Sequence, residues 1–109
     1  MTMQELIDRL EKTIGPDLDL DHAIAAIIRP EDGHGVLLYT GDIEAALTTL
    51  PAGTRWLVGD GDPYPSAWAN IRTKTGDAIH QHAATPALAL CIAALKARMA
   101  VSTHENDGP

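Results

Sequence analysis

The segment TPALALCIAALKARMA, residues 85–100, predicts a long helix near the end of the chain. Thr85 is suited to cap this helix, and Pro86 fits its first position, where a missing N–H costs nothing. Apolar side chains then recur at helical spacing, at Ala87, Leu88, Cys91, Ile92, Leu95 and Met99. Two short runs that each carry a tryptophan precede the helix, TRWLVGD (54–60) and SAWANIRT (66–73). Together these segments predict a helix that packs against a sheet.

The tryptophan-bearing runs have the composition and the flanking turn residues of strands. We expect strands at 54–59 and 66–73, joined as a hairpin by the turn sequence DGDPYP, residues 60–65. A further short strand is expected at 78–81, and the run VLLYT predicts another at 36–40. The hairpin connection indicates that the sheet is antiparallel.

Three more helices are predicted before the hairpin, at residues 3–14, 17–28 and 43–50. Thr2 can cap the first of them, with Glu5 as its capping-box partner. The second helix begins among aspartates, which interact favourably with the positive end of the helix dipole.

The order of these elements places helices first, in the middle and last, with antiparallel strands between them. We therefore expect an α+β fold in which a small antiparallel sheet of three to four strands is covered by helices on both faces, an α/β/α sandwich. Residues 1–101 should form one compact domain, and residues 102–109 a polar, flexible tail.

Charge and composition exclude several classes of protein. The 109 residues carry a net charge of −7. Residues 1–62 hold 12 acidic and 4 basic side chains, whereas residues 63–109 hold 3 and 4. This acidic balance argues against binding to duplex nucleic acid, because that mode needs a basic footprint. The chain shows no signal peptide and no apolar run long enough to span a membrane, so we expect a cytoplasmic protein.

Motifs for catalysis or for metal binding are incomplete. Asp17, Asp19 and Asp21 imitate the start of a calcium loop, but the glycine and the glutamate that such a loop needs are missing, so a capped, acidic helix start is expected. His80 and His82 have the spacing that places both rings on one face of a strand, and we expect surface histidines rather than a zinc site. We expect no catalytic residue, no metal and no cofactor.

Cys91 is the single cysteine, so the chain has no internal disulfide. It lies among apolar residues of the C-terminal helix, where a thiol should behave as a small buried hydrophobe. Burial of this kind raises the pKa of a thiol rather than lowering it, so Cys91 is not expected to be a nucleophile.

The hairpin carries the candidate binding residues. Trp56, Tyr64, Trp68 and Arg72 could form a surface for stacking and for cation–π contacts. Alternation places Trp56 and Val58 on one side of their strand, and Trp68, Asn70 and Arg72 on one side of theirs. The turn adds two acidic residues, Asp60 and Asp62, as further candidates. The alternative is that both tryptophans pack in the core beneath a helix.

Three segments together resemble the phage ABA sandwich domain, a family of small proteins of phages and prophages of Proteobacteria. They are LIDRLEKTIGPDLDLDHAIA (6–25), YTGDIEAALTTLPAGTRWLV (39–58) and ATPALALCIAALKARM (84–99). The resemblance implies helix–sheet–helix layers and a phage origin. It implies no reaction, because no catalytic residues of the family can be carried over, and a fold without a site does not determine function.

We therefore expect a phage-derived, non-enzymatic accessory protein that acts by binding a host or phage protein, as an inhibitor of a host defence system such as an anti-CRISPR. Its acidic surface would suit the basic groove of a defence complex. One alternative is a protein that binds small molecules or sequesters a nucleotide signal, with the hairpin aromatics stacking on bases and Arg72 holding phosphate. Another is a structural or assembly protein of the phage particle. The oligomeric state stays open.

Overall fold

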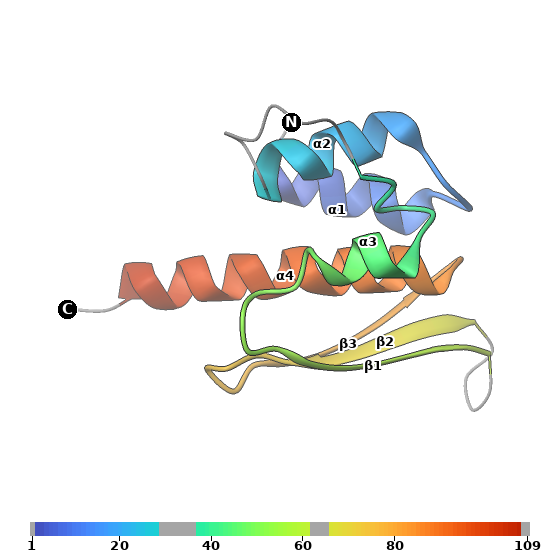
Figure 1. The fold of residues 1–109 in the computed structure, drawn as a ribbon. Coiled ribbons are helices and arrows are strands. Elements are labelled where there is room, and N and C mark those ends of the chain that lie inside the picture. The colour runs from blue at the N-terminus through green and yellow to red at the C-terminus, as the bar shows by residue number, and fades with distance from the viewer. Residues whose placement is uncertain (1, 29–36, 62–65, 108–109) are drawn as a thin grey trace.

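A computed structural model describes residues 2–28, 37–61 and 66–107 of the chain. Within these ranges the chain forms four helices and three strands (Figure 1). In chain order they are α1 (Met3–Lys12), α2 (Leu18–Ile28), α3 (Ile43–Leu47), β1 (Arg55–Asp60), β2 (Ala67–Arg72), β3 (Ala78–Ala83) and α4 (Pro86–Asp107).

The sheet is antiparallel and has the strand order β1-β2-β3. Its register pairs Leu57 on β1 with Asn70 on β2, and Asn70 with His80 on β3. The neighbouring residues pair one by one on either side of this row. The expected α+β class and the expected antiparallel strands at 54–59, 66–73 and 78–81 are therefore confirmed, with bounds that shift by one or two residues.

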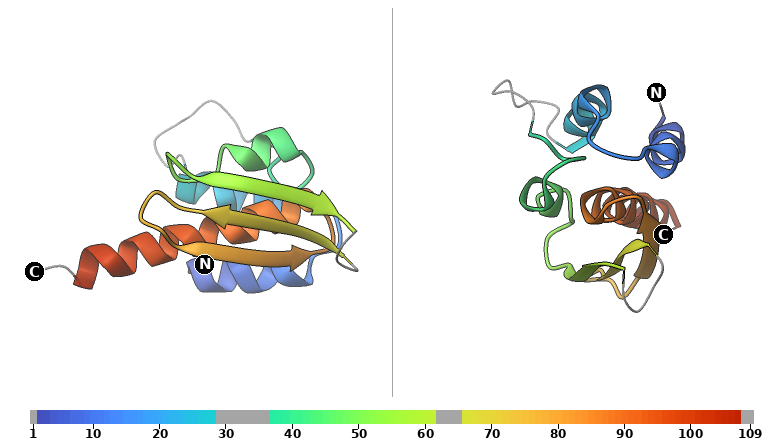
Figure 2. Two further views of the ribbon diagram at one scale, coloured as in Figure 1. Left: turned by 90° about the horizontal axis from the view of Figure 1, so that it is seen from below. Right: turned by 90° about the vertical axis from the view of Figure 1, so that its right-hand side faces the viewer.

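Helix α4 is the centre of the molecule. It contacts all three strands on one side, α1 on the opposite side and α3 along its flank, and α1 in turn packs against α2 (Figures 1 and 2). Every residue from 87 to 95 is buried, on all sides of the helix. A helix with apolar residues on all sides is expected to be buried on all sides, and this part of α4 is. The alanines of α4 allow this close approach, because their small side chains let backbones lie near one another.

The order of the layers differs from the helix–sheet–helix arrangement that we expected. The described helices all lie on one face of the sheet, α4 and α3 next to it and α1 and α2 beyond them (Figure 2). The physical reason is that α4 has two apolar sides. It buries one against the strands and the other against α1, so the remaining helices are stacked on α4 and no described helix covers the opposite face of the sheet.

The strand predicted at 36–40 is wrong for its described residues, 37–40, while Val36 lies outside the described ranges. These residues enter a turn, in which the backbone N–H groups of Gly41 and Asp42 donate to the Leu38 carbonyl. Thr40 is held by a side chain rather than by a neighbouring strand. Its backbone N–H and its hydroxyl both donate to the buried carboxylate of Asp21, each at 2.8 Å.

The helix starts agree with their sequence signals. The Glu5 N–H donates to the Thr2 hydroxyl oxygen at 3.1 Å, and the Leu88 N–H donates to that of Thr85 at 3.2 Å. Helix α2 begins at an Asp17 carboxylate that accepts from the Leu20 N–H. The helix ends agree less well, since α3 is shorter than the predicted helix at 43–50 and α4 continues past residue 102. No helix in the described part of the chain has the length and apolar character that a membrane span requires.

Candidate ligand-binding site

The face of the sheet that points away from α4 presents the side chains of alternate residues. On β2, the small or apolar residues Ala67, Ala69 and Ile71 are buried towards α4, whereas Trp68, Asn70 and Arg72 point the other way. The register then assigns the partners of these three residues to the same face, which we call the open face. They are Arg55, Leu57 and Gly59 on β1 and Ala78, His80 and His82 on β3.

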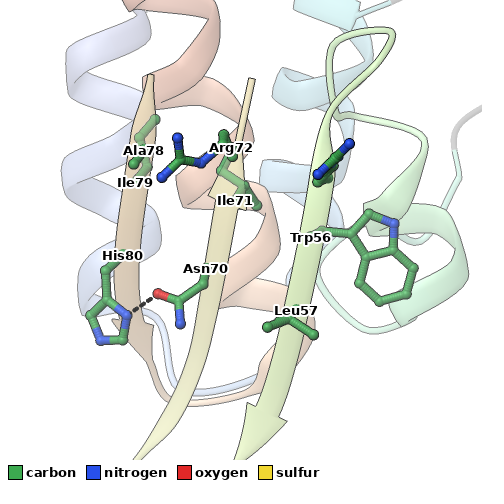
Figure 3. Close-up of a pocket in the computed structure, with 9 residues that line it drawn as sticks. Trp56, Leu57, Asn70, Ile71, Arg72, Ala78, Ile79 and His80 are labelled. Atoms are coloured by element: carbon green, nitrogen blue, oxygen red, sulfur yellow. Dashed lines mark hydrogen bonds between the residues drawn. The ribbon is translucent and has the colours of Figure 1, made fainter. Parts of the chain in front are cut away.

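A shallow groove of about 540 Å³ crosses the open face at the end where Arg55 and Arg72 lie (Figure 3). Leu57 and Asn70 contribute to its floor, and His80 borders it on the β3 side. Ligand sites for small molecules commonly have volumes of about 300–1,000 Å³ and combine apolar surface with a few placed polar groups. The groove has both properties.

Two arginines stand side by side at this end of the groove. Arg55 and Arg72 are directly opposite one another on neighbouring strands, and both are exposed. Neither guanidinium forms a hydrogen bond or an ion pair with any residue that the structure describes. Like charges directly opposite one another in a sheet are destabilising. The free protein therefore holds two neighbouring cations, and neither forms an ion pair with a described carboxylate.

A third cation extends this pair. Lys74 follows β2 and lines a second hollow of about 330 Å³ together with both arginines. Gly53 borders the same hollow with a φ of +79°, and a Cβ at this position would lie 3.4 Å from the Cβ of Lys74. The aliphatic part of the Lys74 side chain thus packs against the backbone of Gly53, which has no side chain. Three of the eight Lys and Arg residues of this acidic chain meet at one end of the open face.

A chain of hydrogen bonds fixes the amide of Asn70 in the groove. Its Oδ1 is bonded to the Nδ1 of His80, the Nε2 atoms of His80 and His82 are 2.7 Å apart, and the Nδ1 of His82 lies 3.2 Å from the Ser66 hydroxyl. Since the amide oxygen can only accept, His80 donates from Nδ1 and accepts at Nε2 from His82, which accepts in turn from Ser66. The Nδ2 group of Asn70 stays available as a donor.

The two tryptophans lie on opposite faces of the sheet. Trp68 covers Gly59 on the open face, so closely that a Cβ on this glycine would lie 2.5 Å from the indole ring. Trp56 pairs with Ile71, on the face that points towards α4, and its side chain is 45 % exposed at the edge of the sheet. The predicted alternation within each strand is confirmed, but the structure does not bring the two indoles together.

The remaining candidate residues of the hairpin contribute less. Asp60 is the last residue of β1 and shares its row with Ala67, and Arg72 lies in the groove as described. Asp62 and Tyr64 lie outside the described residues. Arg55, Leu57, Lys74 and His80 belong to the site but were not among the predicted binding residues. The alternation of side chains along β1 predicts that Arg55 and Leu57 share a face. It does not predict which residues of β2 pair with them.

The histidine pair and the single cysteine have the surroundings that the sequence predicts. His80 and His82 are exposed on one face of β3, as predicted from their spacing, with ring centroids 4.5 Å apart. Cys91 is fully buried, and burial together with the nearby charge of Asp21 raises its pKa to about 12. Within the described ranges, no three His, Cys, Asp or Glu side chains are grouped so that they could hold a metal ion.

Comparisons with protein-family models, with curated proteins and with solved structures give no match for this chain. The interpretation of the site therefore depends on its residues and their geometry.

Proposed function

We propose that this chain is a non-enzymatic binding protein that holds a small anionic molecule on the open face of its sheet. The observation that carries the proposal is the groove itself. It lies on a sheet face that no described helix covers, and it ends at two arginines that form no ion pair with a described residue. A sheet of three strands normally gains stability when apolar side chains cover its faces. Here one face presents cations, an amide and imidazoles instead, which is the composition of a recognition surface.

The arginines, Asn70 and His80 are suited to binding an anion rather than to transferring a proton. Arginine keeps its charge at any physiological pH and offers a rigid set of donors to carboxylates and phosphates. The imidazole of His80 is engaged in orienting Asn70. Leu57, which is 65 % exposed, adds an apolar contact for the body of a ligand.

A substitution that fills the groove tests this proposal. Ala78 is exposed and lines the groove from β3, so Ala78→Trp should occupy the space without disturbing the core. Ala26, which is exposed on α2 in the far layer, provides the matched control Ala26→Trp. Native mass spectrometry of protein purified from a bacterial lysate, together with a thermal-shift screen of cyclic and linear nucleotides and other small anions, measures binding.

We expect a bound small molecule, or a ligand-dependent rise in melting temperature, for the wild type and for Ala26→Trp but not for Ala78→Trp. Wild-type protein that carries no small molecule and that no compound of the screen stabilises would contradict the proposal. Equal binding by both tryptophan variants would place the ligand elsewhere.

A protein partner is the second candidate, and the edge strand β1 favours it. Trp56 and Leu57 are both exposed on this strand, which pairs only with β2 among the described residues. An exposed edge with apolar side chains can accept a strand from another protein. In this role the chain would be the phage accessory protein expected from its resemblance, an inhibitor of a host defence complex. A pull-down at low salt, with the wild type and Leu57→Asp each used to capture host effector complexes, tests this role. If neither protein captures a complex, the result argues against it.

A further inference from the structure

We infer that the ligand of the open face is a nucleotide whose terminal phosphate binds between Arg55 and Arg72, next to Lys74. This inference rests on the proposed function and assigns the chemical class of the ligand. The first step of the argument is the sign and number of the charges. Three cations border the same end of the groove. A carboxylate would offset one of them, whereas a phosphate monoester carries a charge of about −1.5 to −2 near neutral pH.

The second step is geometry. The guanidinium groups come from directly opposite residues of adjacent strands, whose Cβ atoms are typically about 4.5–5.5 Å apart. In the free protein the Arg72 guanidinium is directed towards β3 (Figure 3). From Cβ atoms at this separation, two long and flexible arginine side chains can turn towards each other and offer paired N–H groups to different oxygens of one tetrahedral phosphate. Binding also removes the repulsion between the two arginines, so the ligand gains from an arrangement that is unfavourable in the free protein.

The third step concerns the rest of the ligand. Asn70 lies two residues from Arg72 along β2, a separation of about 7 Å along the strand. The distance from the phosphate position to the Asn70 amide is therefore about the distance that a sugar spans between a phosphate and a base. Its oxygen is held by His80, which leaves Nδ2 to donate to a ring nitrogen or a carbonyl of a planar base. Leu57, on the neighbouring strand, provides an apolar surface under such a base.

The acidic character of the rest of the chain agrees with a small ligand rather than a nucleic acid. The net charge of −7 would repel a long polyanion that extends beyond the groove. A nucleotide places its charge only where the three cations are. It therefore avoids the acidic residues of α1 and α2, which lie in the layer farthest from the sheet (Figure 2).

Calorimetric titration tests the inference with defined probes, namely the four ribonucleoside 5′-monophosphates, the corresponding 3′,5′-cyclic monophosphates and the unphosphorylated nucleosides. The variants are Arg72→Gln, Arg55→Gln and Lys74→Gln, each of which removes one positive charge at the site. Arg9→Gln on α1 is the matched control, because it makes the same change of charge on an exposed residue of the far layer.

We expect at least one 5′-monophosphate to bind the wild type, its cyclic form to bind more weakly because it carries less charge, and its nucleoside to bind more weakly still. Loss of one charge-assisted contact should weaken binding of the 5′-monophosphate about tenfold or more in Arg72→Gln and Arg55→Gln. The effect should be smaller in Lys74→Gln, whose site is a neighbouring hollow, and absent in Arg9→Gln.

Other outcomes overturn the inference and separate it from the proposed function. If nucleotides bind the wild type and Arg72→Gln equally, the phosphate position is wrong. If a nucleoside binds as tightly as its 5′-monophosphate, or if the only ligand recovered from a lysate has no phosphate, the assigned class is wrong while a ligand on the open face remains. A glutamate-rich peptide that binds more tightly than every nucleotide would indicate a protein partner instead. Circular dichroism melts of each variant show that it is folded.

Discussion

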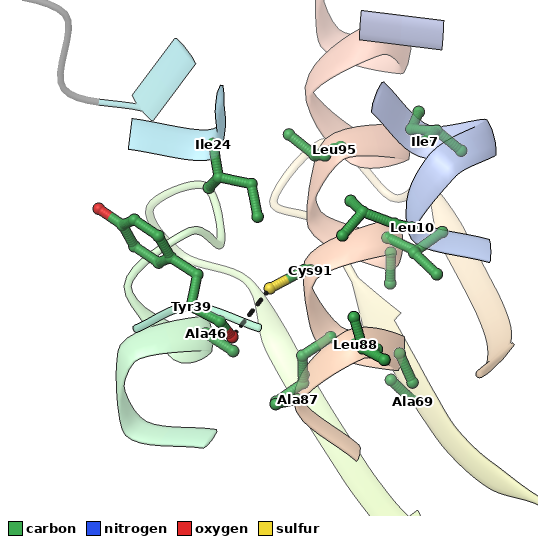
Figure 4. Close-up of a cluster of buried hydrophobic side chains, with 14 of the residues drawn as sticks. Ile7, Leu10, Ile24, Tyr39, Ala46, Ala69, Ala87, Leu88, Cys91 and Leu95 are labelled. Carbon is green, nitrogen blue, oxygen red and sulfur yellow. Dashed lines mark hydrogen bonds between the residues drawn. The ribbon is translucent and has the colours of Figure 1, made fainter. Parts of the chain in front are cut away.

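Ionisation of Cys91 should make the stability of the fold depend on pH in the alkaline range. Its thiol is fully buried in α4 and donates a hydrogen bond to the Tyr39 carbonyl oxygen at 3.3 Å (Figure 4). Burial is the main cause that raises its pKa to about 12, and the charge of Asp21 contributes. In the unfolded chain the pKa of the same thiol lies near its ordinary value of 9.0.

The sign and the magnitude follow from the numbers of protons bound in the two states. Between pH 9 and pH 12 the native state keeps the proton of Cys91 and the unfolded state loses it, so the free energy of unfolding falls as the pH rises. The stabilisation is fully present below pH 9. One group in this situation has a slope of about 1.4 kcal/mol per pH unit. Stability should therefore fall by about 3 kcal/mol between pH 7 and pH 11, most of it above pH 9.

Urea unfolding of the wild type and of Cys91→Ala, followed by circular dichroism from pH 7 to pH 11, measures this effect. All other ionisable groups are the same in the two proteins, so the difference between the two curves isolates the thiol. At pH 7 the variant should be less stable by about 1–2 kcal/mol, because it leaves a small cavity. Near pH 11 it should be the more stable protein. Curves that stay parallel across the range would refute the reasoning, since the thiol would then ionise equally in both states.

Substitutions at three further positions test the packing and charges described above. Gly59→Ala should cost about 1–3 kcal/mol, because the added Cβ forces the ring of Trp68 off β1, and a shift of tryptophan fluorescence should accompany the lower urea midpoint. Thr40→Val should cost about 2–3 kcal/mol by removing a hydroxyl that the buried Asp21 needs, whereas Thr40→Ser should lose no more than about 1 kcal/mol; equal losses would show that the methyl group matters more. Arg72→Gln should stabilise the ligand-free protein by up to about 1 kcal/mol at low salt, and a lower melting temperature would contradict the proposed repulsion.

Local signals in the sequence predicted most of the secondary structure. The hydroxyls of Thr2 and Thr85 cap α1 and α4 as expected, and the alternating runs around Trp56 and Trp68 form the hairpin. These predictions succeed because caps and strand periods depend on residues close together in the chain. The strand predicted at 36–40 fails for the opposite reason. Its described residues have strand-like composition, yet Thr40 is bound by a carboxylate 19 positions earlier.

The candidate site was predicted only in part. Arg72 and Trp56, which both line the groove, were identified from the hairpin, and the shared face of Trp68, Asn70 and Arg72 followed from alternation. The second arginine of the pair could not be identified in this way. Arg55 meets Arg72 only through the register of β1 against β2, and a shift of one residue would have moved Arg55 away from it.

The sequence by itself determined that the chain is an α+β protein, where its helices begin, which side chains share a face of each strand, and that the thiol of Cys91 is buried. Each of these follows from periodicity, capping or local apolarity. Only the tertiary structure decided that α4 lies between the sheet and α1, that no described helix covers the other face of the sheet, and that three cations meet on that face. Those features depend on which apolar side of α4 each element covers and on the pairing of distant residues. The sides of α4 that are covered and the pairing of distant residues depend on how the whole chain packs, so no local segment determines them.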